Sequence, residues 1–292
     1  MHAIAFALAA LALSGQIENP AAEAVFFQSH RGGLLEVPEN TQAALDHAWA
    51  LPGSVPEIDL RTTSDNVIVC MHDETPNRTT NAPPPWADVN LREIPLEQLR
   101  QWDAGTHFGA AYAGEKVPML DEVFARMKGR PERLVYLDLK DVDLDALLAK
   151  IRDHGLERQV IFVHGDPQMC GKLQARCPGA RTMTWISGAP AAIRARYEEF
   201  ARSGFAGISQ LQFHLRARRA QPPFAYVLDD DFLRKAVQAT RAAGVELQLR
   251  PFQFDAASLR RLMDLGVRWY VTDAPRAFAD AVEGARRLDA AP

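Results

Sequence analysis

The feature that most constrains the fold of this chain is a regular alternation of strand-like and helix-like segments. Eight short runs have the apolar, β-rich composition of buried strands, and helical patterns separate most of them. Such alternation predicts parallel strands joined by right-handed crossovers, and eight units of this kind close into a barrel. The eight runs are 24–29, 55–60, 134–139, 160–163, 181–185, 207–211, 245–249 and 269–272.

Helices are expected at 40–49, 144–155, 191–203, 230–244 and 256–266, with a final helix in the tail after Ala277. Asn40 or Thr41 is placed to cap the first of them, and several end at glycine, as helices often do. A length of 292 residues suits one large barrel or two smaller domains. We therefore predict an α/β fold, a (β/α)8 TIM barrel, with an open doubly wound sheet as the competing architecture.

One long interval between the second and third strands breaks this rhythm. It begins with an accessory strand at 67–71, which is expected to pair with the second strand, and it contains a proline-rich stretch and the amphipathic run 96–102. Loops of this length in a compact domain are usually functional. We predict a small insertion subdomain at 62–120, on the catalytic end of a barrel domain that spans 23–292.

The first residues have several features of an export signal. The apolar run 3–13 has the length of a signal peptide and is followed by Ser14 and Gly15, although no Lys or Arg precedes it. The run is too short to span a bilayer, and no other stretch is long and apolar enough. We expect residues 1–22 to be a signal peptide and leader, and the mature protein to be periplasmic or secreted. The alternative is an N-terminal helix that packs on the barrel of a cytoplasmic protein.

Charge and cysteine content restrict the partners and the redox chemistry. A formal net charge of -4 is a poor basis for general nucleic-acid binding, which requires a basic face. The three cysteines, Cys70, Cys170 and Cys177, are too few for a disulfide framework. Cys170 and Cys177 could close a short loop in an oxidising compartment, and geometry decides whether they do.

Side chains suited to catalysis follow the first two strands. His30 and Arg31 come directly after the first strand, and residues just beyond a barrel strand face the active site. Glu57 and Asp59 are two residues apart on the second strand, so they point to the same side. Two neighbouring carboxylates repel each other and resist burial, and a hard divalent cation such as Mg²⁺ or Ca²⁺ relieves that cost.

More titratable residues follow at later positions. His72 and Asp73 come after the accessory strand, Asp138 and Lys140 share one face of the third strand, and Asp273 follows the last strand. For Asp273, a turn stabilised by its side chain competes with a catalytic role. Together these residues suit phosphoryl transfer, because cations neutralise the phosphate oxygens while one histidine deprotonates the nucleophile and the other protonates the leaving oxygen.

In their order, these motifs resemble the glycerophosphodiester phosphodiesterase family, part of the PLC-like phosphodiesterase superfamily of TIM barrels. The resemblance extends from about Phe26 to Pro275 and is weak between about Leu156 and Pro251. It implies a barrel with a small inserted domain, one divalent metal ion, and hydrolysis of small-molecule glycerophosphodiesters to glycerol 3-phosphate and an alcohol. The strings that carry it are SHRGGLLEVPENTQAAL, EIDLRTTSDNVIVCMHDETPNRTTN, LREIPLEQLRQWDAGTHFGAAYAGEKVPMLDEVF, LVYLDLKD and WYVTDAPR.

The resemblance also implies a role for each matching side chain. The implied set has His30 and His72 as the acid–base pair, Arg31 and Lys140 at the substrate phosphate, Glu57, Asp59 and Asp138 as metal ligands, and Glu39, Asn40 and Asp73 in support.

Two departures from the family pattern bear on specificity. The family usually has Glu where this chain has Asp138, and the shorter side chain would shift the ion or admit a bridging water. An aromatic run that the family often carries on the seventh strand is missing, and Gln248 and Arg250 take its place. Arg250 could bind an anionic head group or form a surface salt bridge, so the alcohol that is released stays open.

Two other functions compete with this interpretation. A phospholipase-type barrel would act on a lipid substrate and form a cyclic phosphate. A catalytically weak barrel would hold a phosphodiester or a metal without turnover.

Overall fold

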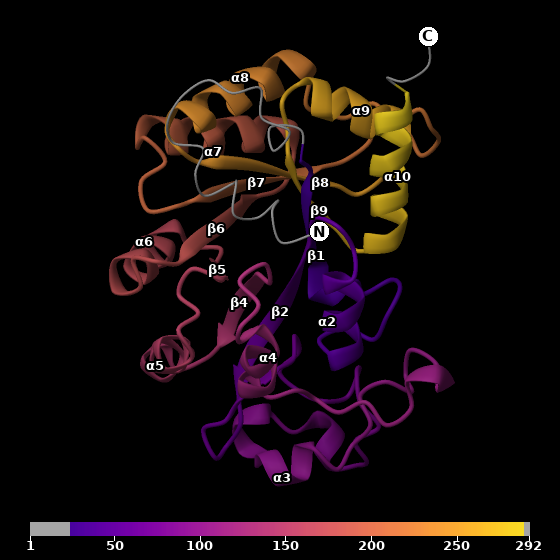
Figure 1. Ribbon diagram of the computed structural model, residues 1–292, viewed down its shortest axis with the longest axis vertical. Coiled ribbons are helices and arrows are strands. Elements are labelled where there is room, and N and C mark those ends of the chain that lie inside the picture. Colours follow the sequence, from indigo (N-terminus) through magenta and orange to yellow (C-terminus); the bar gives the residue numbers. More distant parts are fainter. Residues whose placement is uncertain (1–23, 289–292) are drawn as a thin grey trace.

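The computed structural model describes residues 24–288, in which eight parallel strands form a closed barrel. Strand β1 (Phe26–Ser29) pairs with both β2 (Ser54–Thr62) and β9 (Trp269–Thr272), and these two pairings close the ring. The predicted TIM barrel is therefore confirmed (Figure 1). From β2 to β9 the ring continues through β4 (Val135–Asp141), β5 (Val160–Val163), β6 (Arg181–Ile186), β7 (Gln210–Leu215) and β8 (Glu246–Pro251).

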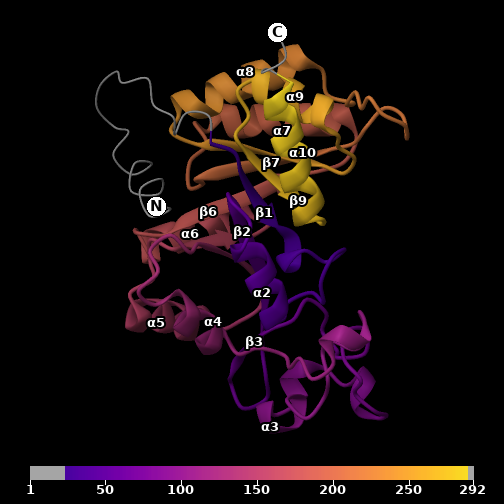
Figure 2. The same ribbon diagram turned by 45° about the vertical axis from the view of Figure 1, so that its right-hand side comes forward.

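Helices cover the outside of the barrel (Figures 1 and 2). Several begin at a side chain that accepts a hydrogen bond from the first turn, as Asp143 does for α5 and Asp229 for α8. The helices that follow barrel strands or lead into them are α2 (Gln42–Trp49), α4 (Leu120–Met127), α5 (Leu144–His154), α6 (Pro167–Arg176), α7 (Pro190–Arg202), α8 (Asp230–Ala242), α9 (Ala256–Asp264) and α10 (Pro275–Arg287).

Several elements differ from the sequence-based prediction, and helix α4 was not predicted. Strand β7 begins at Gln210, three residues later than the predicted start, because the chain first turns at Gly207 with a positive φ of 78°. Helix α6 was not predicted. It carries Gly171 in its interior, and a Cβ on Gly207 would lie 2.9 Å from the Gly171 Cα. The close approach of these two backbones explains why Gly171 lies inside α6, where it weakens the helical pattern of the sequence.

The interval after β2 forms a lobe with its own small hydrophobic cluster, at the lower end of the molecule in Figures 1 and 2. Strand β3 (Ile68–Cys70) pairs antiparallel with the end of β2, as predicted for the accessory strand. The other elements are short: η3 (Trp86–Asp88), η4 (Leu91–Glu93), α3 (Leu96–Leu99) and η5 (Ala110–Tyr112). The cluster contains Val69, Met71, Leu91, Ile94, Leu99, Trp102, Ala104 and Val117.

The barrel interior contains a hydrogen-bonded polar layer. The Gln212 side-chain amide donates to Oε1 of Gln248 at 2.7 Å, and the Gln248 side-chain amide donates to the backbone carbonyl of Tyr270 at 3.0 Å. The Tyr136 hydroxyl donates to Gln210 at 2.8 Å. Gln248 is 0% exposed, and its amide is used within this layer, as burial of a polar group requires. The structure thus places Gln248 in this layer, and its part in substrate specificity stays a prediction.

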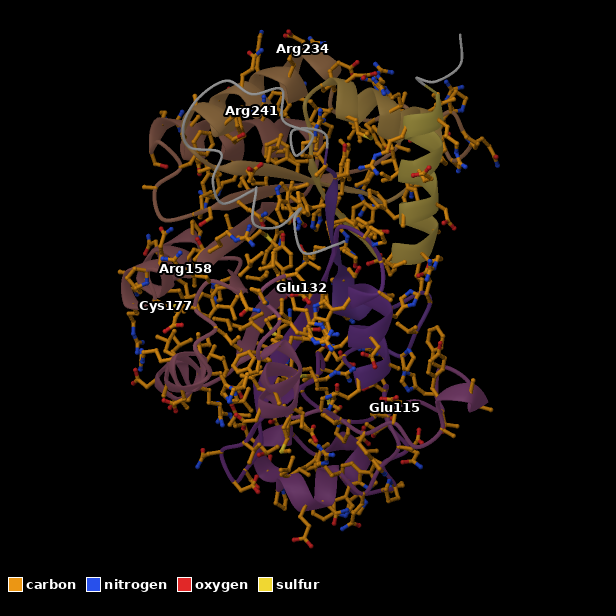
Figure 3. All side chains as sticks on the ribbon, in the orientation of Figure 1. Glu115, Glu132, Arg158, Cys177, Arg234 and Arg241 are labelled. Carbon is orange, nitrogen blue, oxygen red and sulfur yellow. The ribbon has the colours of Figure 1, made fainter. Side chains whose placement is uncertain are left out.

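All three cysteines are free and buried, so Cys170 and Cys177 do not form a disulfide. Cys177 directly follows α6, near the edge of the molecule in Figure 3. The predicted signal peptide and leader, residues 1–22, lies outside the described residues. From 24 to 288, no helix combines the length and the apolar character needed to cross a bilayer.

Candidate active site

A tight turn after β1 aims His30 into the mouth of the barrel. The 3-10 helix η2 (His30–Gly32) and the residue after it have positive φ angles of 53°, 81° and 120° at Arg31, Gly32 and Gly33. A Cβ on Gly32 would lie 2.4 Å from the Cβ of Ala44, so the turn packs directly on α2. Glycine is required there both by the backbone conformation and by the space.

His30 is held by a carboxylate and an arginine. Its Nδ1 lies 2.7 Å from Oδ1 of Asp273. Because an ionised carboxylate only accepts hydrogen bonds, Nδ1 carries the proton and the lone pair of the neutral ring is on Nε2. Burial lowers the pKa of His30 by more than the Asp273 hydrogen bond raises it, and the charge of Arg250 lowers this pKa further. His30 is therefore neutral near pH 7, and its Nε2 can accept a proton.

Asp273 is a site residue that the sequence left undecided. Strands β1 and β9 pair with Ser29 opposite Thr272, so the next residues of both strands, His30 and Asp273, emerge side by side. Arg250 on β8 donates to the same Asp273 oxygen at 2.8 Å. The predicted closure of the barrel makes the first and last strands neighbours. It would therefore have indicated the contact between His30 and Asp273.

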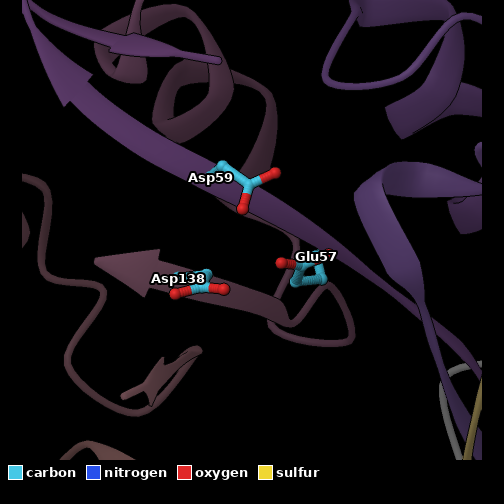
Figure 4. Close-up of side chains that lie close together, drawn as sticks. All are labelled: Glu57, Asp59 and Asp138. Atoms are coloured by element: carbon cyan, nitrogen blue, oxygen red, sulfur yellow. The ribbon is translucent and has the colours of Figure 1, made fainter. Parts of the chain in front are cut away.

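Three carboxylates converge where β2 and β4 pair (Figure 4). Asp59 is directly opposite Asp138 in the register, and Glu57 lies on the same side of β2. Each of the three offers an oxygen within 4.8 Å of the others. Burial, followed by the charges of Asp59 and Asp138, raises the pKa of Glu57 well above its ordinary value. Burial and the charge of Asp59 likewise raise the pKa of Asp138. The cluster is short of positive charge.

Hydrogen bonds hold this cluster in place. The Arg31 backbone N–H donates to Glu57 Oε2 at 2.5 Å. The Asn40 amide donates to Asp59 Oδ2 at 2.8 Å and accepts from the Asp59 backbone at 2.9 Å. Asn40 thus orients the Asp59 carboxylate. Of the two predicted caps of α2, Thr41 is the N-cap, since it accepts from the Ala44 backbone, and a capping role of Asn40 is wrong.

The cluster fits a hard divalent cation. Lys140 lies 2.6 Å from Asp138 Oδ2 and 3.2 Å from Asp59 Oδ1. Even so, Asp59 Oδ1 is buried and accepts no hydrogen bond from the part of the chain that the structure describes. Such an atom is costly unless a ligand binds it. Carboxylate oxygens are the ligands that Mg²⁺ and Ca²⁺ prefer.

His72 has the same arrangement as His30. Its Nδ1 lies 2.7 Å from Asp73 Oδ1, so this ring also keeps Nε2 free for chemistry. Arg78 donates to Asp73 at 2.6 Å and to Glu39 at 2.7 Å, and the Arg78 hydrogen bond lowers the pKa of Asp73. Sequence analysis gave Arg78 no role. Glu39 also accepts from Arg31 at 3.0 Å.

Backbone contacts bring the His72 segment to the carboxylates. The N–H of Met71, the residue before His72, donates to the Asp59 carbonyl at 2.9 Å. Arg61 donates from Nε to the His72 carbonyl at 2.8 Å. The structure therefore places the backbone of the His72 segment beside β2, the strand that carries Glu57 and Asp59.

A cavity of about 370 Å³ opens beside this cluster. Asp138 and Lys140 line it from β4, His164 comes from the end of β5, and Trp185 comes from β6. The His164 Nδ1 accepts a hydrogen bond from the Asp166 backbone at 3.0 Å, so Nε2 of the neutral ring carries its proton. The cavity offers room for part of a ligand next to the cluster.

Comparison with known proteins yields one consistent family. A model described as "Glycerophosphoryl diester phosphodiesterase family" matches residues 30–277. A glycerophosphodiester phosphodiesterase of Caldanaerobacter subterraneus subsp. tengcongensis is 35% identical over 140 residues, which are 46% of this chain and 55% of that protein. The chain thus matches about half the length of this curated relative.

Solved structures resemble this barrel over nearly their whole length. The crystal structure of a glycerophosphodiester phosphodiesterase from Agrobacterium tumefaciens is 26% identical, with a TM-score of 0.66 over 88% of this chain and 99% of that one. A phosphodiesterase from Oleispira antarctica, solved with the product sn-glycerol-3-phosphate, is 22% identical, with a TM-score of 0.63 over 88% and 96%. At that identity the second likeness shows the fold alone.

Proposed function

The chain belongs to the glycerophosphoryl diester phosphodiesterase family, and on that premise we propose that it hydrolyses glycerophosphodiesters to glycerol 3-phosphate and an alcohol. The observation that carries the proposal is the convergence of two carboxylate-held histidines with a buried carboxylate cluster. Glu57, Asp59 and Asp138 would hold one divalent ion. When bound, such an ion supplies positive charge to the phosphate oxygens.

The two histidines divide the proton transfers. His30 is neutral near pH 7 with Nε2 unprotonated, so it accepts the proton of the attacking water. His72, when protonated, donates from Nε2 to the oxygen of the leaving alcohol, and the Asp73 carboxylate stabilises its positive charge. One P–O bond forms to water and the P–O bond to the alcohol breaks, with no further reactant.

Cationic side chains complete the phosphate site. Arg31 Nε is buried and donates no hydrogen bond within residues 24–288, and it lies 3.6 Å from Asp59 Oδ2, next to the place proposed for the phosphate. The Lys140 ammonium lies at the edge of the carboxylate cluster and the cavity. Both are positioned to offset the negative charge that builds on the phosphate oxygens.

The test incubates the protein with glycerophosphocholine and Mg²⁺, Ca²⁺ or Mn²⁺. A coupled assay measures the release of glycerol 3-phosphate. His30→Ala and His72→Ala should each reduce turnover by about 10²–10⁴-fold. His154→Gln is the control, because His154 lies at the outer end of α5 and pairs with Asp121. Absence of release with every ion and every common head group would refute the proposal.

The lipid alternative has no specific support among the described residues. Their exposed large hydrophobic side chains are Leu35, Phe108 and Leu288. Phe108 packs against Tyr112, whose hydroxyl donates to the Glu36 carbonyl beside Leu35. Two exposed side chains, Leu35 and Phe108, do not make the contiguous patch that a lipid-binding surface needs. A cyclic phosphate product would favour this alternative, and tight binding without turnover would favour the catalytically weak barrel.

A further inference from the structure

Positively charged side chains gather around one aromatic ring at the ends of β7 and β8. His214 and Arg250 are register partners on these adjacent strands. The His214 ring packs edge-on against Phe252, with 5.5 Å between the ring centroids. The guanidinium carbons of Arg216 and Arg250 each lie 5.0 Å from the Phe252 centroid. Phe252 therefore fixes the positions of two guanidinium groups and one imidazole.

The charge of this group, which we call the Phe252 cluster (His214, Arg216, Arg250 and Phe252), is poorly compensated. Asp273 is the only carboxylate that forms an ion pair with either arginine in the described part of the chain. Arg216 is exposed, and its side chain has no ion pair or hydrogen bond to residues 24–288. Burial, followed by the charges of Arg250, His30 and Arg216, lowers the pKa of His214 to about 4. The cluster therefore offers guanidinium donors to an anion.

The Phe252 cluster adjoins the reaction centre. An Arg250 Nη2 lies 3.1 Å from Nδ1 of His30, the histidine that we assign as the base. The cavity beside the carboxylates is lined from β2, β4, β6, the turn after β5 and the insertion lobe, whereas the cluster lies at the ends of β7 and β8. A phosphodiester has two arms, so with its phosphate at the carboxylates one arm can enter the cavity and the other can reach the cluster.

From this geometry we propose that the preferred substrates are glycerophosphodiesters whose alcohol bears a second anionic group, which Arg216 and Arg250 bind. The inference rests on the proposed function, because glycerol itself is uncharged and only the other arm can carry this charge. Guanidinium groups suit the role, since they donate paired, charge-assisted hydrogen bonds to carboxylate or phosphate oxygens.

The test uses two substrates of equal size that differ by one charge. In one, glycerol 3-phosphate is esterified with hydroxypropionate, and in the other with hydroxypropionamide. The measured quantity is the ratio of kcat/KM for the carboxylate substrate to kcat/KM for the amide. We expect a ratio of about ten or more for the unchanged enzyme, where a factor of ten corresponds to about 1.4 kcal/mol.

Variants at two neighbouring arginines separate specific binding from general attraction. Arg216→Ala should bring the ratio close to one, and Arg216→Lys should restore part of it. Arg219→Ala is the matched control, because Arg219 is exposed in the same loop and its replacement removes the same charge. It should leave the ratio unchanged.

The outcomes distinguish this inference from the proposed function. Equal kcat/KM for both substrates would refute the inference and leave the proposed function intact. Equal loss of the ratio in Arg216→Ala and Arg219→Ala would also refute it, because general electrostatic attraction would then explain the preference. If neither substrate is hydrolysed while glycerophosphocholine is, the inference fails and the proposed function stands. If none of the three is hydrolysed with any of the metal ions, the proposed function fails and the inference fails with it.

Discussion

The buried carboxylates should make the metal-free protein less stable than a variant that lacks one of them, Glu57→Gln. Burial, followed by the charges of Asp59 and Asp138, raises the pKa of Glu57 above the ordinary value of 4.5. An acid with a raised pKa in the folded state contributes stability that is lost as the pH rises from the unfolded pKa through the folded one. Metal-free protein should therefore lose stability as the pH rises above 4.5.

The size of the effect follows from the distances. Two unit charges within 4.8 Å of each other repel by at least about 3.5 kcal/mol at an effective dielectric constant of about 20. Glu57 has two such neighbours, and the attraction of Lys140 offsets part of the repulsion. The glutamine oxygen can still accept the hydrogen bond from Arg31. We expect a net stabilisation of about 1–4 kcal/mol, which corresponds to about 2–4 °C in Tm per kcal/mol for a domain of this size.

The assay is thermal unfolding with a chelator at about pH 5 and about pH 8. From the lower to the higher pH, the Tm of the unchanged protein should decrease by more than the Tm of Glu57→Gln does. Glu198→Gln is the charge-matched control, since Glu198 is exposed on α7. Added Mg²⁺ or Ca²⁺ should raise the Tm of the unchanged protein and not that of Glu57→Gln. A metal-free Glu57→Gln that melts below the unchanged protein at the higher pH would refute the reasoning.

Three further predictions test other parts of the structure. Arg250→Gln should move the acidic limb of the pH profile of kcat/KM to higher pH, because Arg250 lowers the pKa of His30. Asp273→Asn should move this limb to lower pH, because Asp273 raises the same pKa. Unchanged limbs in both variants would contradict this assignment. Gly32→Ala should destabilise the fold by more than about 1–2 kcal/mol in denaturant titration, since its Cβ would meet that of Ala44. The three buried cysteines should resist thiol reagents until the protein unfolds, and a reductant should not change the Tm.

Much of the barrel followed from local rules, whereas some of its contacts depend on closure. Alternating segments predicted the parallel strands, and the two-residue period of a strand placed Glu57 and Asp59 on one side. Asp273 was left undecided because its contact with His30 joins residues 243 positions apart. Only the pairing of the first and last strands brings them together.

The direction of a side chain was harder to predict than the position of its strand. Gln248 and Arg250 are two apart on β8, yet Gln248 lies in the polar layer inside the barrel and Arg250 reaches the mouth. The height of each residue along the barrel axis decides whether its side chain lies in the interior or at the mouth. That height depends on the stagger between neighbouring strands, which the sequence does not reveal. Arg78 was overlooked for a similar reason, because its partners Glu39 and Asp73 come from different segments.

Phosphorus NMR of glycerophosphocholine during incubation with metal-loaded protein tests the central claim most directly. The account predicts that the diester resonance is replaced by that of a single phosphate monoester, glycerol 3-phosphate, and that conversion stops with a chelator or with His30→Ala. A diester resonance that persists with Mg²⁺, Ca²⁺ and Mn²⁺ alike, or an accumulating cyclic phosphate, would contradict it.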